Sequence, residues 1–503
     1  MWRCLQKEAF PDTGRSSKTT PTATLSHRWG ARPVVALAAY VEYKKAVVVH
    51  DTRSVATFQP YTQSPREAPR CESLVALLGT DSVLLPGSTG YNTTLSSYFT
   101  PQASAVHPLC FVTPHTATDV SDVVKSLSST GDCIFAIRSG GHTWFPDASN
   151  APSGVTIDLR GLNSIDVNAE NSSACVGIGN TWDSVYTKLD SLGLSVAGGR
   201  VAGVGVGGLT LGGGISYFGP QHGWTCNQAI SFEVVLANGS IVEANEQHNS
   251  ELWWGLRGGS NNFGIVTRVT LATSSRIAAP QNYNTNASFF FGWGISQPAG
   301  QTVPIALNAL VYTQPEENEN PAVYQDILDL PSLTALDVTV ANISTLSEQG
   351  AASQPPQVSR YLTATTTFVP TEAMILAAFD AYNNSVKSIQ NLTGVSWSLI
   401  IEPVPPQTYL RGASKNALGL GDRTDTLAIY TAARAVMEVI EAKAKALGAY
   451  DPYIYLNYAA PWQEVIASYG EASVSRLQRL RANVDPSEVF TRLVPGGFKV
   501  PST

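Results

Sequence analysis

Short apolar runs alternate with polar, helix-like stretches from about residue 71 onward. Phe135–Arg138 and residues 155–159 have the length of buried strands. Residues 182–192 place Val185 and Leu189 on one face of a predicted helix, and a second helix is expected from Thr118, because hydroxyl and acidic residues fill its first turn. Further strands are expected at Cys110–Val112 and at residues 174–178, 232–236, 241–244 and 263–271.

The pattern changes at about residue 276, where glycine-rich turns become rare and the predicted elements become longer. Strands are expected at residues 306–312, 336–340 and 396–401, and helices at 371–388 and 426–447. This pattern predicts an antiparallel sheet backed by helices. The chain then ends with a predicted strand at 453–458, a helix at 474–483 and a tail rich in proline and glycine.

Composition restricts the classes of function. The chain has 503 residues, of which 43% are hydrophobic and 14% charged, so we expect a globular protein of more than one domain. A net charge of -7 without basic runs argues against a nucleic-acid partner. No apolar stretch approaches the roughly 20 residues that span a bilayer, and cysteines and histidines do not cluster at metal-ligand spacing. We therefore expect no membrane partner and no metal, and the oligomeric state is not indicated.

The first 70 residues do not match the folded pattern that follows. The opening thirty are polar and rich in serine and threonine, unlike a secretory signal, so residues 1–70 are expected to be a leader or a disordered segment. Other features favour a secretory or extracellular location, where Cys71 and Cys110 could form a disulfide. These features are seven potential N-glycosylation sites, at Asn92, Asn171, Asn238, Asn286, Asn342, Asn383 and Asn391.

Two glycine-rich segments are candidates for binding a phosphate. The first, Arg138-Ser139-Gly140-Gly141-His142-Thr143, follows a strand, and its glycines allow backbone N–H groups to converge on an anion. The second, residues 203–214, could do the same or be only a structural turn. It contains a Gly-x-Gly-x-x-Gly match, but it follows more glycine instead of a strand, so an irregular loop is expected in place of a Rossmann site.

The combination of these motifs resembles a known family. Arg138-Ser139-Gly140-Gly141-His142, with Ile157-Asp158-Leu159 downstream, is similar to the FAD-binding domain of the vanillyl-alcohol oxidase and p-cresol methylhydroxylase superfamily. The berberine-bridge-enzyme-like branch, and its fungal members in particular, matches best. The other matching stretches are 198–208, 211–216, 253–266, 455–458, Asp485-Pro486 and Phe490. The resemblance covers nearly everything after about residue 70.

The resemblance implies an α+β fold with a two-part FAD-binding domain. Its parts would be residues 71–275 (core about 104–275) and 452–503, with a substrate domain, 276–451, inserted between them. His142 takes the place of the histidine that the family bonds to the flavin 8α-methyl group. Relatives with a second covalent bond carry a cysteine where this chain has Val201, so a single histidyl link is expected. Cys226 lies outside that position and is expected to be buried or in a disulfide.

The same family resemblance implies which residues bind FAD and which take part in catalysis. Tyr455 and Tyr458 are the catalytic candidates, since a phenol near the flavin ring could take a substrate proton if a neighbour lowered its pKa. On the predicted strand Tyr455 and Asn457 would share one face. Glu402 and Tyr409 are weaker candidates, and a structural role is preferred for Glu402. Contacts to FAD are expected from Arg138, Ser139, Gly140, Gly141, His142, Thr143, Gly199, Gly203, Gly207, Gly208, Leu209, Gly213, Gly214, Ile265, Val266 and Asn457.

The expected activity is that of an FAD-dependent oxidase in fungal secondary metabolism. Hydride would pass from an alcohol, sugar or metabolite intermediate to flavin N5, and oxygen would reoxidise the flavin. One alternative is a redox-neutral cyclase of the same fold, and another is a non-enzymatic binding protein, which the paired glycine loops disfavour. A nucleophile-elbow hydrolase is not expected, because the stretch from Gly214 to Phe218 lacks the closing glycine.

Overall fold

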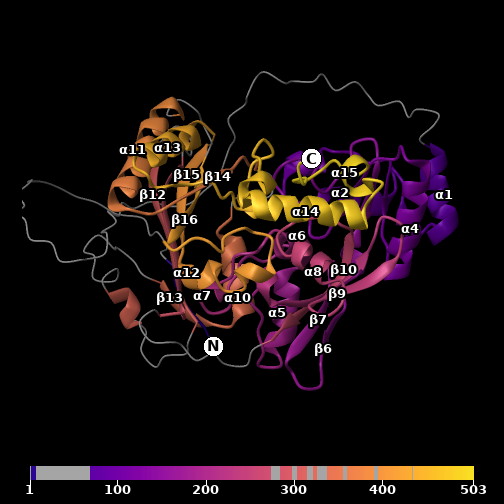
Figure 1. The fold of residues 1–503 in the computed structure, drawn as a ribbon, viewed down its shortest axis with the longest axis horizontal. Coiled ribbons are helices and arrows are strands. Elements are labelled where there is room, and N and C mark those ends of the chain that lie inside the picture. The colour runs from indigo at the N-terminus through magenta and orange to yellow at the C-terminus, as the bar shows by residue number, and fades with distance from the viewer. Residues whose placement is uncertain are drawn as a thin grey trace, which may run out of the picture.

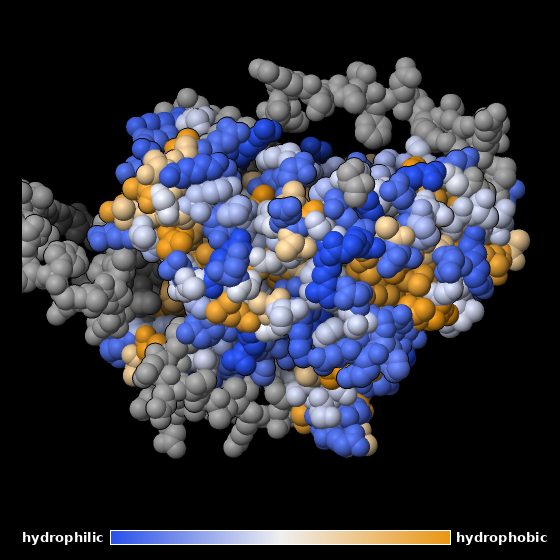
Figure 2. All heavy atoms as spheres, viewed as in Figure 1, coloured by the Kyte–Doolittle hydropathy of each residue, from blue (hydrophilic) through white to orange (hydrophobic). Residues whose placement is uncertain are grey.

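The computed structural model describes residues 2–6, 68–273, 284–296, 303–313, 321–325, 337–354, 359–389, 395–432 and 434–502. These residues form an α+β fold of three sheets (Figure 1). The two smaller sheets are built from the first half of the chain, and the largest sheet is built mainly from residues after 286. Hydrophilic residues cover much of the visible face, with hydrophobic ones interspersed (Figure 2).

The four-stranded sheet has the order β2-β3-β5-β4, and β3 and β4 both run parallel to β5. Parallel strands need a crossover connection, which α4 provides between β3 and β4. A capping box starts α4, in which Thr116 and Asp119 exchange side-chain and backbone hydrogen bonds. The bounds are β2 (Val83–Leu84), β3 (Cys110–Val112), α4 (Ala117–Thr130), β4 (Phe135–Arg138) and β5 (Val155–Asp158). Helix α1 (Ala68–Leu78) precedes β2, and helices α2 (Thr89–Ser96) and α3 (Pro101–Ser104) lie between β2 and β3.

The five-stranded sheet is antiparallel, in the order β6-β7-β10-β8-β9. The predicted Asn238-Gly239 hairpin joins β8 to β9, and Gly239 takes the positive φ (79°) that this turn requires. The bounds are β6 (Ile165–Val167), β7 (Ser173–Gly177), β8 (Ala229–Val235), β9 (Ile241–Asn245) and β10 (Ile265–Ala272). The accompanying helices are α5 (Trp182–Asp190), α6 (Val206–Leu211), α7 (Gly219–His222) and α8 (Ser250–Leu256).

The eight-stranded sheet, in the order β13-β1-β12-β11-β15-β16-β14-β17, is also antiparallel. Helices α11 and α13 back it through a shared apolar cluster that includes Phe368, Met374 and Met437, which confirms the predicted architecture. The bounds are β1 (Trp2–Gln6), β11 (Ala287–Ser296), β12 (Val303–Tyr312), β13 (Asp337–Ala341), α10 (Ile343–Ala352), β14 (Ala364–Phe368), α11 (Glu372–Ile389), β15 (Ser396–Val404), α12 (Pro406–Tyr409), β16 (Leu427–Ala432), α13 (Arg434–Ala446) and β17 (Tyr450–Asp451).

Several predicted elements were wrong. The single helix expected over 426–447 is strand β16 followed by helix α13, because residues 427–432 pair with both β14 and β15. The strand expected over 453–458 is not formed, and Leu456–Tyr458 make a short 3-10 helix instead. Within 203–214, where an irregular loop was expected, residues 206–211 form helix α6. Strands β2, β6, β11 and β14 were not predicted.

The end of the chain packs on the first half of the chain. Tyr453, Leu477, Phe490 and Val500 belong to the same hydrophobic core as strands β3 to β10. Accordingly, α14 (Glu471–Val484) and α15 (Val489–Arg492), drawn in yellow, lie beside the indigo and magenta elements in Figure 1. Of the segment before residue 71, the structure describes β1, which pairs with β12 and β13, and the start of α1. The intervening residues, 7–67, lie outside the described part of the chain.

Candidate active site

The two glycine-rich segments touch each other through their backbones. A Cβ atom added to Gly140 would lie 2.6 Å from the backbone N and Cα of Gly205, so neither position has room for a side chain. Ser139 links the segments further, because its hydroxyl donates to the Ile178 carbonyl (2.7 Å) and accepts from the Gly207 amide (3.1 Å). The turn after β4 and the start of α6 therefore form one unit.

Arg138, the last residue of β4, packs against the chain next to the glycine turn. Its guanidinium is fully buried, stacks 3.7 Å from the centre of the Tyr98 ring, and donates to the carbonyls of Thr94 and Ser97. Asp158 on the neighbouring strand lies 3.7 Å away and balances its charge. The side chain is thus engaged by protein groups, and the contact between Arg138 and FAD stays a prediction.

His142 follows the turn and presents a neutral ring. The imidazole stacks on Phe99, with ring centres 3.8 Å apart and planes 12° apart, and Phe99 in turn contacts Tyr361. Burial lowers the pKa of His142 to about 4, so the ring carries no charge at neutral pH. Thr143 follows directly. A neutral imidazole keeps a nitrogen lone pair, which is what bond formation to a carbon atom requires.

Gly199, just before the second segment, and the glycines within that segment serve different purposes. A Cβ on Gly199 would lie 2.5 Å from the Trp182 ring, whereas at Gly203 and Gly208 it would meet nothing within 4 Å. Gly199 therefore allows Trp182 to pack, while Gly203 and Gly208 leave open space beside the loop. Leu209, on α6, accepts a hydrogen bond from Asn457 through its carbonyl (3.1 Å).

Gly213 and Gly214 make the turn after α6, both with positive φ (106° and 83°). Their carbonyls accept hydrogen bonds from the amides of Cys226 and Thr225 (both 2.8 Å). Ile265 and Val266 are buried at the start of β10, paired with β8. The FAD contacts of these four residues stay predictions.

Tyr455 and Asn457 meet through hydrogen bonds instead of by sharing the face of a strand. The Tyr455 hydroxyl accepts from the Ile215 amide (2.9 Å) and from Asn457 Nδ2 (3.0 Å), and its ring stacks on Trp224. Burial raises the pKa of Tyr455 well above its usual value. The phenol is therefore protonated at neutral pH and is held within the protein.

Tyr458 belongs to a buried cluster with Arg200 and Glu402. The Arg200 guanidinium lies 2.5 Å from a carboxylate oxygen of Glu402, donates to the Tyr458 hydroxyl (2.8 Å), and brings together residues from three distant segments. The Tyr458 hydroxyl in turn donates to Glu402 (3.3 Å). Burial and the nearby Glu402 raise the pKa of Tyr458, despite the opposing effect of Arg200. Burial alone would lower the pKa of Arg200, but Glu402 raises it, so Arg200 stays charged.

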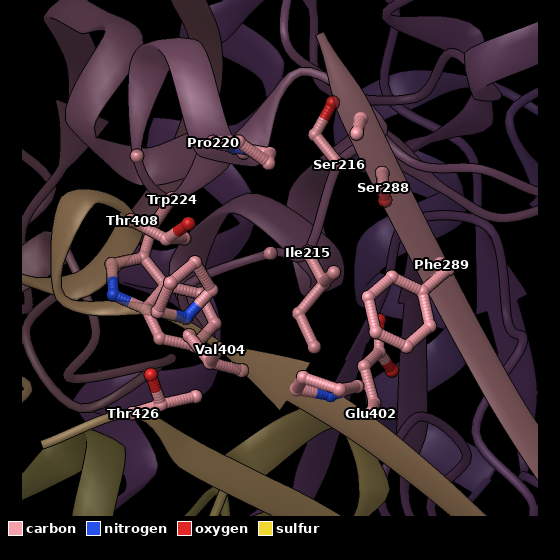
Figure 3. Close-up of a pocket in the computed structure, with 16 residues that line it drawn as sticks. Ile215, Ser216, Pro220, Trp224, Ser288, Phe289, Glu402, Val404, Thr408 and Thr426 are labelled. Carbon is pink, nitrogen blue, oxygen red and sulfur yellow. The ribbon is translucent and has the colours of Figure 1, made fainter. Parts of the chain in front are cut away.

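Glu402 also lines a cavity of about 210 Å³ between the two halves of the molecule. Residues 214–224 form one wall, and β11 and β15 form the other. Figure 3 shows Glu402 and Phe289 at one side, Thr408 and Trp224 at the other, and Ile215 between them. Tyr409 lies outside the lining and donates its hydroxyl to the Asp425 carbonyl (2.6 Å). The structure thus places Glu402 at the cavity and Tyr409 outside its lining.

Three residues of this region were missed by sequence reasoning. Phe99, Arg200 and Trp224 contact His142, Glu402 and Tyr455 respectively. Arg200 had a usable signal, because a lone arginine in a glycine-rich loop and a lone glutamate in an apolar strand can form an ion pair. The contacts of Phe99 and Trp224 depend on the tertiary fold and had no such signal.

The structure also shows the states of three cysteines and the surroundings of Val201, the residue after Arg200. Cys71 and Cys110 form the disulfide that the sequence allowed. Cys226 is buried and free, one of the two states expected for it. Val201 lies beside Gly350 on α10, which approaches this loop from the substrate-domain side.

The residues present fit FAD. Among the described residues, no hydrogen bond uses the backbone N–H of Gly140 or Gly141, which leaves these groups for a ligand's phosphate. There is open space beside Gly203 and Gly208 for the cofactor, and a neutral His142 lies at the end of the turn, where it could bond to the flavin.

Within the described ranges, no helix combines the length and apolar character needed to cross a bilayer. The same ranges hold no group of three or more His, Cys, Asp or Glu placed to bind a metal ion.

Comparisons with known proteins agree with this cradle. The model of the FAD-binding-domain family matches residues 108–245. The FAD-dependent monooxygenase CTB5 of Cercospora beticola is 31% identical over 483 residues, covering 86% of this chain and 91% of that protein. The FAD-dependent monooxygenase sdcF of Emericella nidulans is 32% identical, covering 86% and 98%. Oligopeptidase PhomG' of Diaporthe leptostromiformis is 36% identical, but the match spans only 37% of that protein's length.

Solved structures show the same fold. BBE-like 1 of Physcomitrella patens superposes with a TM-score of 0.64 at 18% identity, covering 86% of this chain and 99% of that one. Xylooligosaccharide oxidase of Myceliophthora thermophila superposes with a TM-score of 0.61 at 19% identity, covering 86% and 99%. The motifs, the fold and the relatives lead to one conclusion: the chain has the fold of the berberine-bridge-enzyme-like proteins, and it belongs to the family of FAD-linked oxidoreductases that includes the fungal proteins CTB5 and sdcF.

Proposed function

We propose that the protein is an oxidase that removes hydride from a small-molecule substrate and uses oxygen as the acceptor. The observation that carries the proposal is Glu402, a carboxylate that lines a cavity and is bound to the glycine-rich loop through Arg200. When bound, FAD supplies the hydride acceptor and the reactivity toward oxygen. The chain's own residues must hold the cofactor, orient the substrate and remove a proton.

The turn at residues 139–143 and helix α6 would hold the cofactor through backbone N–H groups. His142 would bind it covalently through a ring nitrogen, because the ring is neutral and packed against Phe99. Stacking fixes the plane of the imidazole, so forming the bond would cost little further loss of rotational entropy. The expected single attachment rests on Val201, which offers no thiol at the second position.

Glu402 would accept the proton of a substrate hydroxyl. Of Glu402, Tyr455 and Tyr458, Glu402 alone lines the cavity. The raised pKa values of both tyrosines keep them protonated at neutral pH, which suits hydrogen-bond donation better than proton removal. Tyr458 and Arg200 would then be positioning residues that aim the carboxylate.

The biological setting is proposed from the relatives. Those named FAD-dependent monooxygenases come from fungi, which supports a role in fungal secondary metabolism. A secretory or extracellular location is supported by the Cys71–Cys110 disulfide and by exposed asparagines in potential glycosylation sites.

The test is to measure oxygen consumption, peroxide release and anaerobic flavin reduction with a panel of alcohols, sugars and metabolite intermediates, chosen without selection for peroxide release. An oxidase releases one peroxide per oxygen consumed. Oxygen uptake without peroxide would indicate a monooxygenase, the activity named for the relatives, and bound flavin that no substrate reduces would indicate a redox-neutral cyclase.

The role of Glu402 is tested in the same assay. Glu402→Gln keeps the shape of the side chain but removes its basicity, so we expect flavin reduction to slow by about 10²- to 10⁴-fold. Glu243→Gln is the matched control, because Glu243 is an exposed glutamate on strand β9. Equal rates for wild type and Glu402→Gln would contradict the assignment.

A further inference from the structure

Lys499, in the tail after α15, differs from the other lysines that the structure describes. It is half-buried, whereas the others are exposed, namely Lys125, Lys188, Lys387, Lys415, Lys443 and Lys445. Burial lowers the pKa of Lys499 to about 7, although the nearby Asp485 opposes this effect. Because a charged amine loses hydration when it is buried, proteins rarely keep a lysine inside without an anion beside it. A bound anion would stabilise the charged form of Lys499.

The described part of the protein supplies no anion for this ammonium group. Lys499 donates a hydrogen bond to the side-chain oxygen of Asn261 (3.2 Å), which is a neutral amide. Among the described residues, no carboxylate lies within ion-pair distance of Lys499. The two oxygens of Asp485 are engaged elsewhere, since they accept from the amides of Val489 and Phe490 (both 2.8 Å). Lys499 is therefore available to a negatively charged ligand.

The tail before Lys499 packs on the chain just after the first glycine turn of the cradle. Phe498 contacts Phe145 edge to face, with ring centres 5.8 Å apart. Gly496 lies against the backbone carbonyl of Asp147, so closely that a Cβ atom would not fit there. The tail therefore follows the segment that leads away from the turn.

The asparagine that binds Lys499 belongs to a loop held by the second segment of the cradle. The amide of Ser260, the residue before Asn261, donates to the carbonyl of Leu211 at the end of α6 (3.1 Å). Gly497 lies beside Asn261, because a Cβ atom on it would be 3.4 Å from the Asn261 side-chain oxygen. The backbone N–H groups of Asn261 and Gly497 have no acceptor among the described residues. Lys499 is thus next to residues that contact both segments, with further donors nearby.

We infer that Lys499 binds the diphosphate of FAD. In oxidised FAD at neutral pH the diphosphate carries the negative charge, whereas the flavin and adenine rings are neutral. The turn at residues 139–143 and α6 would supply neutral N–H donors, and Lys499 would add the positive charge that these donors lack. A substrate anion fits less well, because neither Lys499 nor Asn261 lines the cavity next to Glu402.

The experiment compares the binding of FAD and riboflavin to the full chain in the His142→Ala background, where the flavin is not bonded to the protein. Riboflavin has the same ring system as FAD but no phosphate. Binding to the flavin-free protein is followed by the change in flavin fluorescence. Lys499→Met should weaken FAD binding by about 10- to 100-fold, the worth of one hydrogen bond between charged groups, and change riboflavin binding less than twofold.

Two further variants make the result specific. Lys499→Arg keeps the positive charge and should restore most of the affinity for FAD. Lys387→Met is the matched control, because Lys387 also donates to an asparagine side-chain oxygen, that of Asn384 (3.3 Å), but is exposed on α11. It should change the binding of neither flavin.

Stability of the flavin-free protein separates a binding role from a structural one. Lys499→Met removes a buried charge that no described carboxylate neutralises, so the variant should resist denaturant at least as well as its parent. A lysine with a structural role would instead be needed for stability. If His142→Ala does not fold, the ratio of flavin to protein in purified Lys499→Met with His142 intact gives a second test. This ratio should fall below that of wild type, and Lys499→Arg should restore it.

The inference is overturned if Lys499→Met binds FAD as tightly as its parent, weakens FAD and riboflavin equally, or lowers the stability of the flavin-free protein. A changed flavin reduction potential with unchanged FAD binding would place the charge at the flavin ring and overturn it as well. None of these measurements uses a substrate. Their failure would therefore leave the proposed oxidase function untouched, and failure to find an oxidase activity would leave the role of Lys499 untouched.

Discussion

At the scale of single residues, the candidate site combines a tightly packed glycine turn with a buried ion pair between Arg200 and Glu402. Ser139, Gly140 and His142 are candidates from the sequence because a backbone-lined turn tolerates few residue types, and their contacts with FAD stay predictions. Glu402 was set aside because its partners, Arg200 and Tyr458, come from segments about 200 and 56 residues away in sequence. Pairing across such distances depends on the fold, and a single sequence does not reveal it.

The lowered pKa of His142 predicts how flavin attachment depends on pH. Because burial lowers this pKa to about 4, the ring stays neutral down to about pH 5, whereas an ordinary histidine gains a proton near pH 6.5. Protein produced without riboflavin and then mixed with FAD should therefore attach it at a constant rate from pH 8 down to about pH 5.5. A rate that already halves near pH 6.5 would show that the ring titrates normally.

The two tyrosines should respond differently to removal of their hydroxyls. Tyr458→Phe removes hydrogen bonds to Arg200 and Glu402, so we expect flavin reduction to slow by about 10- to 100-fold. Tyr455→Phe leaves the Ile215 amide without its acceptor, while Asn457 Nδ2 keeps the Leu209 carbonyl, so the variant should mainly lower the free energy of unfolding, by about 1–3 kcal/mol. Stopped-flow reduction and denaturant unfolding measure the two effects.

The alternative outcome is equally clear. If Tyr455 is the base, as the sequence alone indicated, Tyr455→Phe will slow reduction more than Tyr458→Phe and Glu402→Gln do.

At the scale of elements, hydrophobic periodicity predicted the strands of the two smaller sheets except β2 and β6, and it failed where tertiary pairing competes with it. Residues 427–432 carry a continuous apolar pattern that fits either a helix or a fully buried strand, and pairing with β14 and β15 decides for the strand. The 3-10 helix at Leu456–Tyr458 has a similar cause, since Asn457 bonds to the carbonyl of Leu209 on α6.

The contact between the glycine-rich segments can be tested with two substitutions. Gly205→Ala would place its Cβ 2.3 Å from the Gly140 amide nitrogen, so it should destabilise the fold by about 1–3 kcal/mol and reduce flavin content. Gly208→Ala is the matched control for stability, because its Cβ meets no atom within 4 Å and it lies in helix α6. The free energy of unfolding from denaturant titration separates the two, and equal values would contradict the close contact.

At the scale of the whole molecule, the helix-backed antiparallel sheet was predicted, and the C-terminal segment packs into the core of the first half, as the resemblance implied. The hydrophobic pattern alone could not show that residues 452–503 pack on the first half of the chain, because it does not indicate which segment they contact. The residues between β1 and α1 lie outside the described part of the chain, so the nature of this segment stays a prediction.

Glycosylation is predicted to follow exposure. Asn286 is 2% exposed and its side-chain oxygen accepts from Gln221 (2.7 Å), so we expect no glycan there. Mass spectrometry of peptides from protein secreted by a fungal host should instead find glycans among the exposed sites, which are Asn92, Asn171, Asn238, Asn342 and Asn383. A glycan on Asn286 would contradict the packing of β11 against α7, and no glycan anywhere would count against passage through the secretory pathway.

The central claim is a flavin held covalently by His142, and acid precipitation tests it most directly. Wild-type protein and the His142→Ala variant are precipitated with acid, and the visible spectra of pellet and supernatant are recorded. The account predicts yellow colour in the wild-type pellet and in the supernatant of the variant. Yellow colour in the wild-type supernatant would contradict the covalent bond, and a colourless wild-type protein that FAD cannot restore would contradict the cradle itself.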